Sequence, residues 1–238
     1  MISALKKTLR PYKRLFEKYI APPKKPQPIY HRTSYSQEGE DMILSRIFAD
    51  KANGFYVDVG AHHPQRFSNT YYFYLLGWNG INIDAMPESM KIFNEIRPND
   101  LNLEVGISET RQELTYYAFA EPAYSSFCKE VAEEYSQLYH LEIAFEKEIQ
   151  TYPLSEVLDE HLPLNQSIDF LNIDVEGLDY QVLNSNDWEK YRPTIVLVED
   201  LKQTSFCEAN QSKVALFMRE QNYTLYCKTM HTLIFSIN

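Results

Sequence analysis

The sequence predicts an α/β fold built on one mostly parallel β-sheet that ends in an antiparallel hairpin. Short apolar runs of strand type alternate with segments whose apolar residues recur at helical spacing, and strand after helix calls for parallel crossovers. The last two runs, 223–228 and 231–237, are separated by very few residues, so they must pair antiparallel. With 238 residues, the chain can bury one core with short additions.

Helix and strand patterns follow one another through most of the chain. The first half predicts helix 37–49, strand 54–60, helix 68–76, strand 80–85, helix 87–96, strand 101–107 and a strand-like run at 114–119. An acidic and aromatic insertion occupies about 120–152. The second half predicts helix 154–161, the buried strand 168–174, helix 177–185, strand 194–198 and helix 212–221. This alternation is the basis for the parallel sheet.

Residues 1–29 differ in composition from the domain predicted over 30–238. Apolar residues recur at helical spacing from Ile2 to Ile20, and prolines follow, which predicts a basic amphipathic helix and a stiff, extended linker. The first 30 residues carry eight basic side chains against one acidic side chain. Such a helix can lie on an anionic membrane surface, or dock on its own domain or on a second subunit of a homo-oligomer.

Charge and cysteine content narrow the class of protein. The net charge is −10, which argues against nucleic acid as the main partner because phosphate binding needs a basic field. Three widely spaced cysteines without a metal-binding pattern are typical of reduced thiols. The first 30 residues show neither a membrane span nor a secretory signal. We therefore expect a cytoplasmic protein, with peripheral contact of residues 1–20 with the inner membrane surface left open.

The turn after the predicted strand 54–60 is the most informative stretch. This strand closes on Asp58 and Gly60, and the next strand closes on Asp84. Two parallel strands that end side by side in this way form a nucleoside pocket, and an acid after the second strand can bind both hydroxyls of a ribose. The glycine lets the backbone approach the ligand.

The same turn is poorly suited to a dinucleotide. It lacks the G-x-G-x-x-G pattern, and Ala61 and the bulky His62 follow the glycine, so little room remains for a pyrophosphate against a helix N-terminus. A nucleoside without phosphates is expected, and S-adenosylmethionine is the candidate. A nicotinamide-dependent oxidoreductase is the disfavoured alternative, and a non-catalytic binding module on the same fold is a second one.

Several separate motifs together resemble the FkbM family of S-adenosylmethionine-dependent O-methyltransferases. They are Ser36 to Asp41, Val57 to Pro64, Ser68 to Thr70, Gly77 to Gly80, Arg97-Pro98, Ile168 to Gly177 and Arg192-Pro193, and they span about residues 33–200. The resemblance implies a class I methyltransferase (Rossmann-like) fold with a seven-stranded sheet. It also implies methylation of a sugar hydroxyl in a polysaccharide, glycolipid or secondary metabolite. One departure is Asp84-Ala85, where the family commonly has Asp-Pro.

The resemblance also implies which residues contact the cofactor. Asp58, Gly60 and Ala61 would line its amino-acid part, Asp84 its ribose, Ile107 and Ser108 its adenine, and Gln37 would close over its methionine end, with Asp174 nearby. Ser68, Asn69 and Thr70 either cap the predicted helix 68–76 or face the active site.

Methyl transfer to a hydroxyl needs a base that takes the hydroxyl proton. His62 and His63 directly follow the cofactor turn and are natural bases by intrinsic pKa, although either can instead hydrogen-bond to the turn. Asp174 and Glu176 are the rival base, or oxygen ligands for a Mg²⁺ ion that would acidify the hydroxyl. The aromatic insertion at about 120–152 either binds the acceptor sugar or packs as a helical core.

Overall fold

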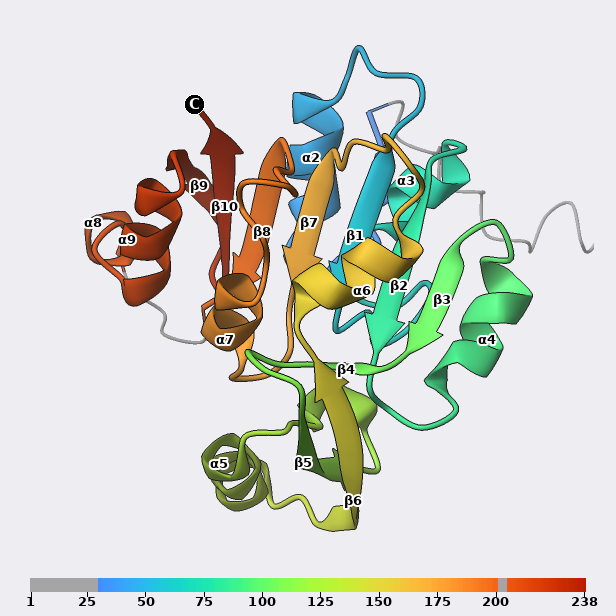
Figure 1. The fold of residues 1–238 in the computed structure, drawn as a ribbon, viewed down its shortest axis with the longest axis vertical. Coiled ribbons are helices and arrows are strands. Elements are labelled where there is room, and N and C mark those ends of the chain that lie inside the picture. The colour runs from blue at the N-terminus through green and yellow to red at the C-terminus, as the bar shows by residue number, and fades with distance from the viewer. Residues whose placement is uncertain (1–29, 201–204) are drawn as a thin grey trace, which may run out of the picture. The chain divides into compact units, whose positions relative to one another are not determined.

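The computed structural model describes residues 30–200 and 205–238, of which residues 34–238 form one compact unit (Figure 1). The predicted helix and linker at 1–29 lie outside the described residues and stay predictions. None of the helices in the described part of the chain is long and apolar enough to cross a membrane.

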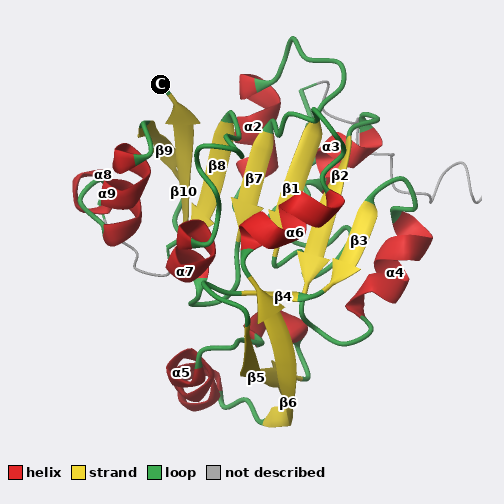
Figure 2. Ribbon diagram, viewed as in Figure 1, coloured by secondary structure: helices red, strands yellow, loops and turns green. Residues whose placement is uncertain are grey.

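A seven-stranded sheet in the order β3-β2-β1-β7-β8-β10-β9 forms the centre of the unit (Figure 2). The strands are β1 (Phe55–Val59), β2 (Asn79–Asp84), β3 (Leu101–Glu104), β7 (Phe170–Ile173), β8 (Ile195–Glu199), β9 (Tyr223–Lys228) and β10 (Thr232–Ile237). The first five are parallel, and β10 is antiparallel to both β8 and β9. The predicted mostly parallel sheet with its closing hairpin is confirmed.

Both faces of the sheet are covered by helices, which explains why the central strands β1 and β7 are buried along their whole length. Side chains alternate between two clusters: Phe55 and Val57 of β1 belong to the larger core, and Tyr56 between them belongs to the smaller one. Leu44 and Phe73 pack in the smaller core from α2 (Glu40–Ile47) and α3 (Tyr71–Leu75). Within residues 30–200 and 205–238, the other helices outside the insertion are α4 (Ser89–Ile96), α6 (Leu154–His161), α7 (Asp179–Asn184), α8 (Phe206–Ala209) and α9 (Lys213–Glu220).

The predicted strand 101–107 is wrong in one respect, because the chain leaves the main sheet after β3. Gly106 and Ile107 form β4, which belongs to a separate sheet of order β4-β6-β5. This sheet and its helices make up the region that we call the cap, residues 106–152. Its further elements are β5 (Gln112–Phe119), the 3-10 helix η1 (Pro122–Tyr124), α5 (Lys129–Tyr139) and β6 (Ile143–Tyr152). Figure 1 shows the cap at the carboxyl ends of β1, β2 and β7.

The insertion was expected either to bind the acceptor or to pack as a helical core, and besides the helix α5 it contains the strands β5 and β6. Most side chains of β6 are exposed, so an alternation of buried and exposed residues is barely visible in the sequence. The strand is held by antiparallel pairing with β5, from Gln112 opposite Thr151 to Phe119 opposite Ile143. Tertiary pairing rather than local pattern therefore determines this part of the fold.

Candidate active site

A cavity lies where β1, β2 and β7 end, with the cap as its opposite wall. Of the predicted site residues, those that line it are Gln37, Asp58, Gly60, Ala61, His62, Ser68, Asn69, Asp84, Ile107, Asp174 and Glu176. Ligands of open α/β sheets bind beyond the carboxyl ends of the strands, which is where this cavity lies. Its lining does not include His63, Thr70 or Ser108.

Gly60 ends β1 in a left-handed conformation, with φ of 82°. A β-carbon at this position would lie 1.6 Å from the carbonyl oxygen of Asp174 at the end of β7. We expected the glycine to leave room for a ligand. The structure shows that it leaves room for the backbone of the neighbouring strand. The absence of a side chain lets β1 and β7 stay adjacent as far as the edge of the cavity.

Asp84 lies at the end of β2 and is buried in the cavity wall. Its Oδ2 accepts a hydrogen bond from the backbone N–H of His62 at 2.7 Å, and its Oδ1 accepts one from the N–H of Met86 at 2.7 Å. Burial raises the pKa of this carboxyl to about 6, against the two hydrogen bonds that lower it. Each oxygen retains a lone pair that can accept a hydroxyl.

Asp58 is held by two side-chain donors. Its Oδ2 accepts the hydroxyl of Thr70 at 2.7 Å, and its Oδ1 accepts the amide of Asn172 at 2.8 Å. The amide oxygen of Asn172 in turn accepts a hydrogen bond from Asn69 at 2.9 Å. Burial raises the pKa of Asp58, and the nearby Arg97 opposes that shift. The acid after β1 is therefore fixed in a network of buried polar groups.

Ser68, Asn69 and Thr70 were expected either to cap a helix or to face the active site, and the three residues differ in this respect. Ser68 accepts the backbone N–H of Tyr71 at 3.0 Å, at the start of α3, and also lines the cavity. Asn69 lines the cavity as well. Thr70 is fully buried behind the wall, where its hydroxyl holds Asp58, so it does not face the cavity.

The two histidines also differ. His62 lines the cavity, its ring is parallel to Phe67 at 6.3 Å between centroids, and neither ring nitrogen has a hydrogen-bond partner. Burial and then Arg66 lower its pKa to about 4. His63 lies outside the lining, and its Nδ1 accepts the backbone N–H groups of Gln65 and Arg66 at 3.1 and 3.0 Å. His63 thus has the backbone-bonding role that we considered as the alternative to a base.

Ser108 was expected at the adenine of the cofactor, but its hydroxyl points elsewhere. It donates to the carbonyl oxygen of Thr110 at 2.8 Å and lies 2.6 Å from the hydroxyl of Thr151. Ile107, the residue before it, does line the cavity. Ser108 lies away from the cavity because the chain leaves the main sheet after β3 and enters the cap at β4.

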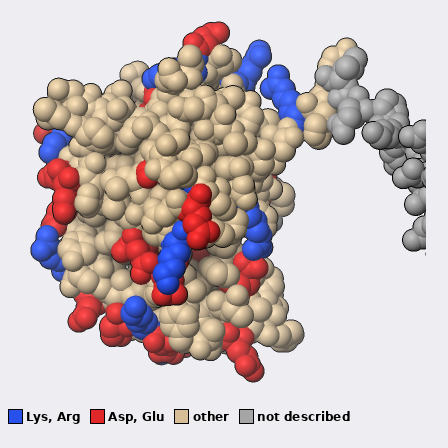
Figure 3. Space-filling model, turned by 90° about the vertical axis from the view of Figure 1, so that its right-hand side faces the viewer, with Lys and Arg blue, Asp and Glu red and all other residues tan. Residues whose placement is uncertain are grey.

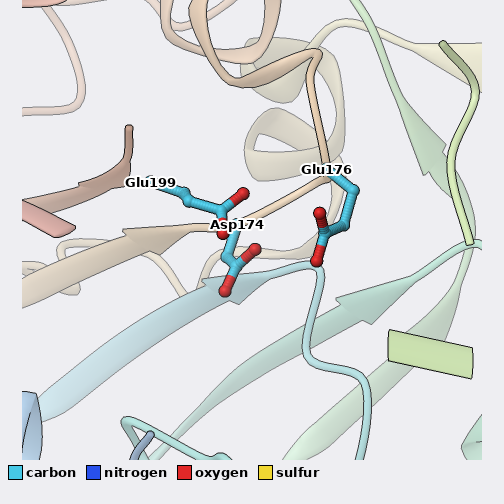
Figure 4. Close-up of side chains that lie close together, drawn as sticks. All are labelled: Asp174, Glu176 and Glu199. Atoms are coloured by element: carbon cyan, nitrogen blue, oxygen red, sulfur yellow. The ribbon is translucent and has the colours of Figure 1, made fainter. Parts of the chain in front are cut away.

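Three carboxylates converge at the ends of β7 and β8 (Figure 4). Asp174, Glu176 and Glu199 each offer an oxygen atom, and these oxygens lie within 4.8 Å of one another. Asp174 and Glu199 share a hydrogen bond, and burial together with the neighbouring acids raises the pKa of both well above the usual range. Burial raises the pKa of Glu176 to about 7. The cluster has oxygen ligands of the kind that Mg²⁺ prefers.

The cap contacts this cluster directly. Tyr135 of α5 donates its hydroxyl to Oε2 of Glu176 at 2.5 Å, and Ser126 donates to the backbone oxygen of the same residue at 2.6 Å. Glu176 has a φ of 53°, which is unusual for a residue with a side chain. The cap therefore holds the loop after β7 in a conformation that the loop alone would rarely adopt.

Some residues of the site were not predicted. Glu199 directly follows the predicted strand 194–198, but its approach to Asp174 depends on β7 and β8 being neighbours and was not predicted. Tyr116 and Phe127 line the cavity from the cap, and their rings pack edge to face at 4.9 Å. Arg97 appeared only as part of an Arg-Pro motif, and no local signal marked it as a fully buried side chain.

A seven-stranded sheet of this order, with an acid-lined cavity at the carboxyl ends of its first strands, defines a Rossmann-like methyltransferase. The family model of the methyltransferase FkbM domain matches residues 58–225, and the chain belongs to this family. The resemblance seen in the sequence is thereby confirmed.

Two solved structures are similar to the chain. One is a candidate RNA methyltransferase from Pyrococcus horikoshii, with 12% identity and a TM-score of 0.43 over 84% of this chain and 83% of that chain. The other is a candidate O-methyltransferase from Klebsiella pneumoniae, with 12% identity and a TM-score of 0.36 over 95% of each chain. No curated protein matches the sequence.

Proposed function

We propose that this methyltransferase transfers the methyl group of S-adenosylmethionine to a hydroxyl of a sugar in a polysaccharide, glycolipid or secondary metabolite. The observation that carries the proposal is a cavity between strand-end acids and an aromatic cap. Asp84 and Glu176 line it from the sheet, and Tyr116 and Phe127 line it from the cap. Aromatic faces beside hydrogen-bonding carboxylates suit a sugar ring.

The residues present fit the cofactor. The Asp84 carboxylate retains acceptor capacity for the two ribose hydroxyls, and Ile83, Met86 and Ile107 supply apolar wall for a purine. Asp58 supplies a negative charge for the ammonium group of the amino-acid end. S-adenosylmethionine brings an activated methyl group on a sulfonium. The chain binds it, orients it toward the acceptor and removes a proton from the acceptor hydroxyl.

Within this proposal Glu176 is the general base. It lines the cavity beside the cap, and Tyr135 holds its carboxylate by a hydrogen bond. Its pKa of about 7 suits a group that must both accept and release a proton near neutral pH. His62 lines the same cavity but is the weaker base, because burial lowers its pKa to about 4.

The carboxylate cluster leaves a second mechanism open within the same function. Asp174, Glu176 and Glu199 together are the candidates for holding Mg²⁺ beside the acceptor, where a cation would make the hydroxyl more acidic. Dialysis against a chelator, followed by addition of Mg²⁺, separates the two mechanisms. Loss of methyl transfer that Mg²⁺ restores supports the metal, and unchanged activity supports Glu176 as a base.

A nucleic-acid acceptor is not part of the proposal. The chain is acidic overall, and on the face drawn in Figure 3 acidic and basic side chains are interspersed. A phosphate backbone is bound by a continuous field of basic residues.

Calorimetry with S-adenosylhomocysteine and NAD, side by side, tests the cofactor assignment. We expect binding of S-adenosylhomocysteine alone, and the reverse result would replace the methyltransferase by the oxidoreductase. Transfer of radiolabelled methyl groups to a panel of neutral glycans, flavonoids and RNA then tests the acceptor class. Labelling of RNA without labelling of glycans would contradict the proposal that a glycan hydroxyl is the acceptor.

A further inference from the structure

Arg97, which follows α4, carries a buried positive charge behind the wall of the cavity. Its side chain is 0% exposed. Its Nε donates to Asp100 at 2.8 Å, its Nη2 donates to the hydroxyl of Tyr56 at 2.7 Å, and its Nη1 donates to the hydroxyl of Thr70 at 2.9 Å. Asp100 neutralises the guanidinium, and the planar fork of the arginine fixes where each of these partners lies.

The contact with Arg97 determines the direction of the next hydrogen bond. A threonine hydroxyl has one proton to donate, and a guanidinium can only donate. The Thr70 oxygen therefore accepts from Arg97, and its own proton goes to Oδ2 of Asp58 at 2.7 Å. Because the acceptor at position 58 is a carboxylate, the hydrogen bond from the Thr70 hydroxyl is charge-assisted and stronger than a bond to a neutral acceptor.

The other oxygen of Asp58 is fixed from the opposite side. The Asn172 amide donates to Oδ1, and Asn69 donates to the amide oxygen of Asn172, which sets the orientation of that amide. Asp58 is 2% exposed, yet it belongs to the lining of the cavity. Since Thr70 donates from behind the wall and Asn69 orients the amide of Asn172, both oxygens of the carboxylate are held while its charge acts on the cavity.

We propose that Arg97 and Thr70 are positioning residues that hold the Asp58 carboxylate in place for the ammonium group of S-adenosylmethionine. This inference rests on the proposed function, because that cofactor carries an ammonium and a sulfonium. Neither Arg97 nor Thr70 lines the cavity, so both act through Asp58. An aspartate free to rotate would bind the same cation less well, since part of the binding energy would go into ordering it.

Thr70→Val tests the inference, because it keeps the shape of the side chain and removes the hydroxyl. Calorimetry with S-adenosylhomocysteine should show affinity about tenfold weaker or more, the effect of losing a hydrogen bond to a charged group. The KM for S-adenosylmethionine should rise while kcat at saturation stays near that of the parent. Thr70→Ser keeps the hydroxyl and should restore most of the affinity.

Tyr223→Phe is the matched control, because it also removes one buried hydroxyl, which there donates to the backbone oxygen of Pro193 far from the cavity lining. It should leave the affinity for S-adenosylhomocysteine unchanged. If Thr70→Val does not fold, Arg97→Lys takes its place, since lysine keeps the charge but loses the fork, and the same weakening is expected.

Parental affinity in a folded Thr70→Val or Arg97→Lys protein would overturn the inference. So would a Thr70→Ser protein as weak as Thr70→Val, because the methyl group rather than the hydroxyl would then matter. A parent protein that binds no S-adenosylhomocysteine would instead refute the proposed function, so the two failures are distinguishable.

Discussion

Gly60 and Asp174 approach each other so closely that a β-carbon on Gly60 would lie 1.6 Å from the Asp174 carbonyl oxygen. The two residues end adjacent strands of the sheet, and the backbone N–H of Asp174 donates to the oxygen of Val59 at 3.0 Å. The contact joins the turn at which we propose the cofactor binds to the loop that carries Glu176.

Gly60→Ala should lower the free energy of unfolding by about 2–5 kcal/mol. A left-handed residue with a side chain costs about 1–2 kcal/mol, and overpacking adds about 1–3 kcal/mol. Gly77→Ala is the control, because Gly77 has a similar φ of 91° but nothing within 4 Å of a β-carbon. Equal losses in urea unfolding of the two variants would show that the contact with Asp174 can relax.

The stability of the protein should depend on pH through Asp84. Its pKa rises from 3.8 to about 6 on folding, so the folded state binds the proton more tightly and stability falls as pH rises from about 4 to 6. Relative to Asp84→Asn, the parent should lose on the order of 3 kcal/mol across this window. Asp187→Asn is the control, since this exposed carboxylate also accepts two backbone N–H groups. If the difference in free energy of unfolding between the parent and Asp84→Asn does not vary with pH, Asp84 is not the group responsible.

Arg97→Met should lower the free energy of unfolding by about 3–5 kcal/mol, because it leaves the buried carboxylate of Asp100 without its cationic partner. Lys91→Met, which breaks an exposed pair with Glu88, should leave stability unchanged. Thermal or urea unfolding measures both. The double variant Arg97→Met/Asp100→Asn should regain part of the loss, and a purely additive result would show that the two charges do not interact.

Glu176→Gln should reduce kcat by about 10²-fold or more while the affinity for S-adenosylhomocysteine stays near that of the parent. Glutamine still accepts the hydrogen bond from Tyr135, so the loop remains held. His62→Gln should reduce kcat much less. A dead His62→Gln protein and an active Glu176→Gln protein would return the role of base to the histidine.

Residues 1–20 should bring the protein to anionic membranes, where a lipid-linked acceptor would reside. Each basic side chain near such a surface contributes about 1 kcal/mol, which suffices for reversible binding that weakens in high salt. Co-sedimentation with phosphatidylserine vesicles should pellet the full chain and leave in solution a chain that begins at Tyr30. Equal pelleting of both would favour docking of the helix on the protein itself or on a second subunit.

The sequence predicts the main sheet well because its central strands are buried on both faces. Strand 80–85 was expected and Asn79–Asp84 is observed, and strand 194–198 corresponds to Ile195–Glu199. A buried strand of this kind can be predicted from its own apolar run, without knowledge of the strands beside it. The closing hairpin was legible for a different reason, since a short connection permits only antiparallel pairing.

The cap and parts of the site were not predictable in the same way. The strand β6 is mostly exposed, so pairing with β5 rather than its own pattern forms it. Asp58 and Asp84 were found because each directly follows an apolar run. Arg97 and Glu199 act across elements distant in sequence, and only the folded chain brings them to their partners.

The attachment of the cap has a consequence for the evolution of this protein. Its first and last residues in the small sheet are neighbours: Gly106 pairs with Thr151, and Ile107 pairs with Tyr152. An insertion whose two ends meet leaves the chain on either side in place, and the cost of closing such a loop grows only slowly with its length. The chain between these paired ends can therefore change in length or sequence while the main sheet keeps its connections, and under the proposed function such changes would alter the acceptor rather than the cofactor.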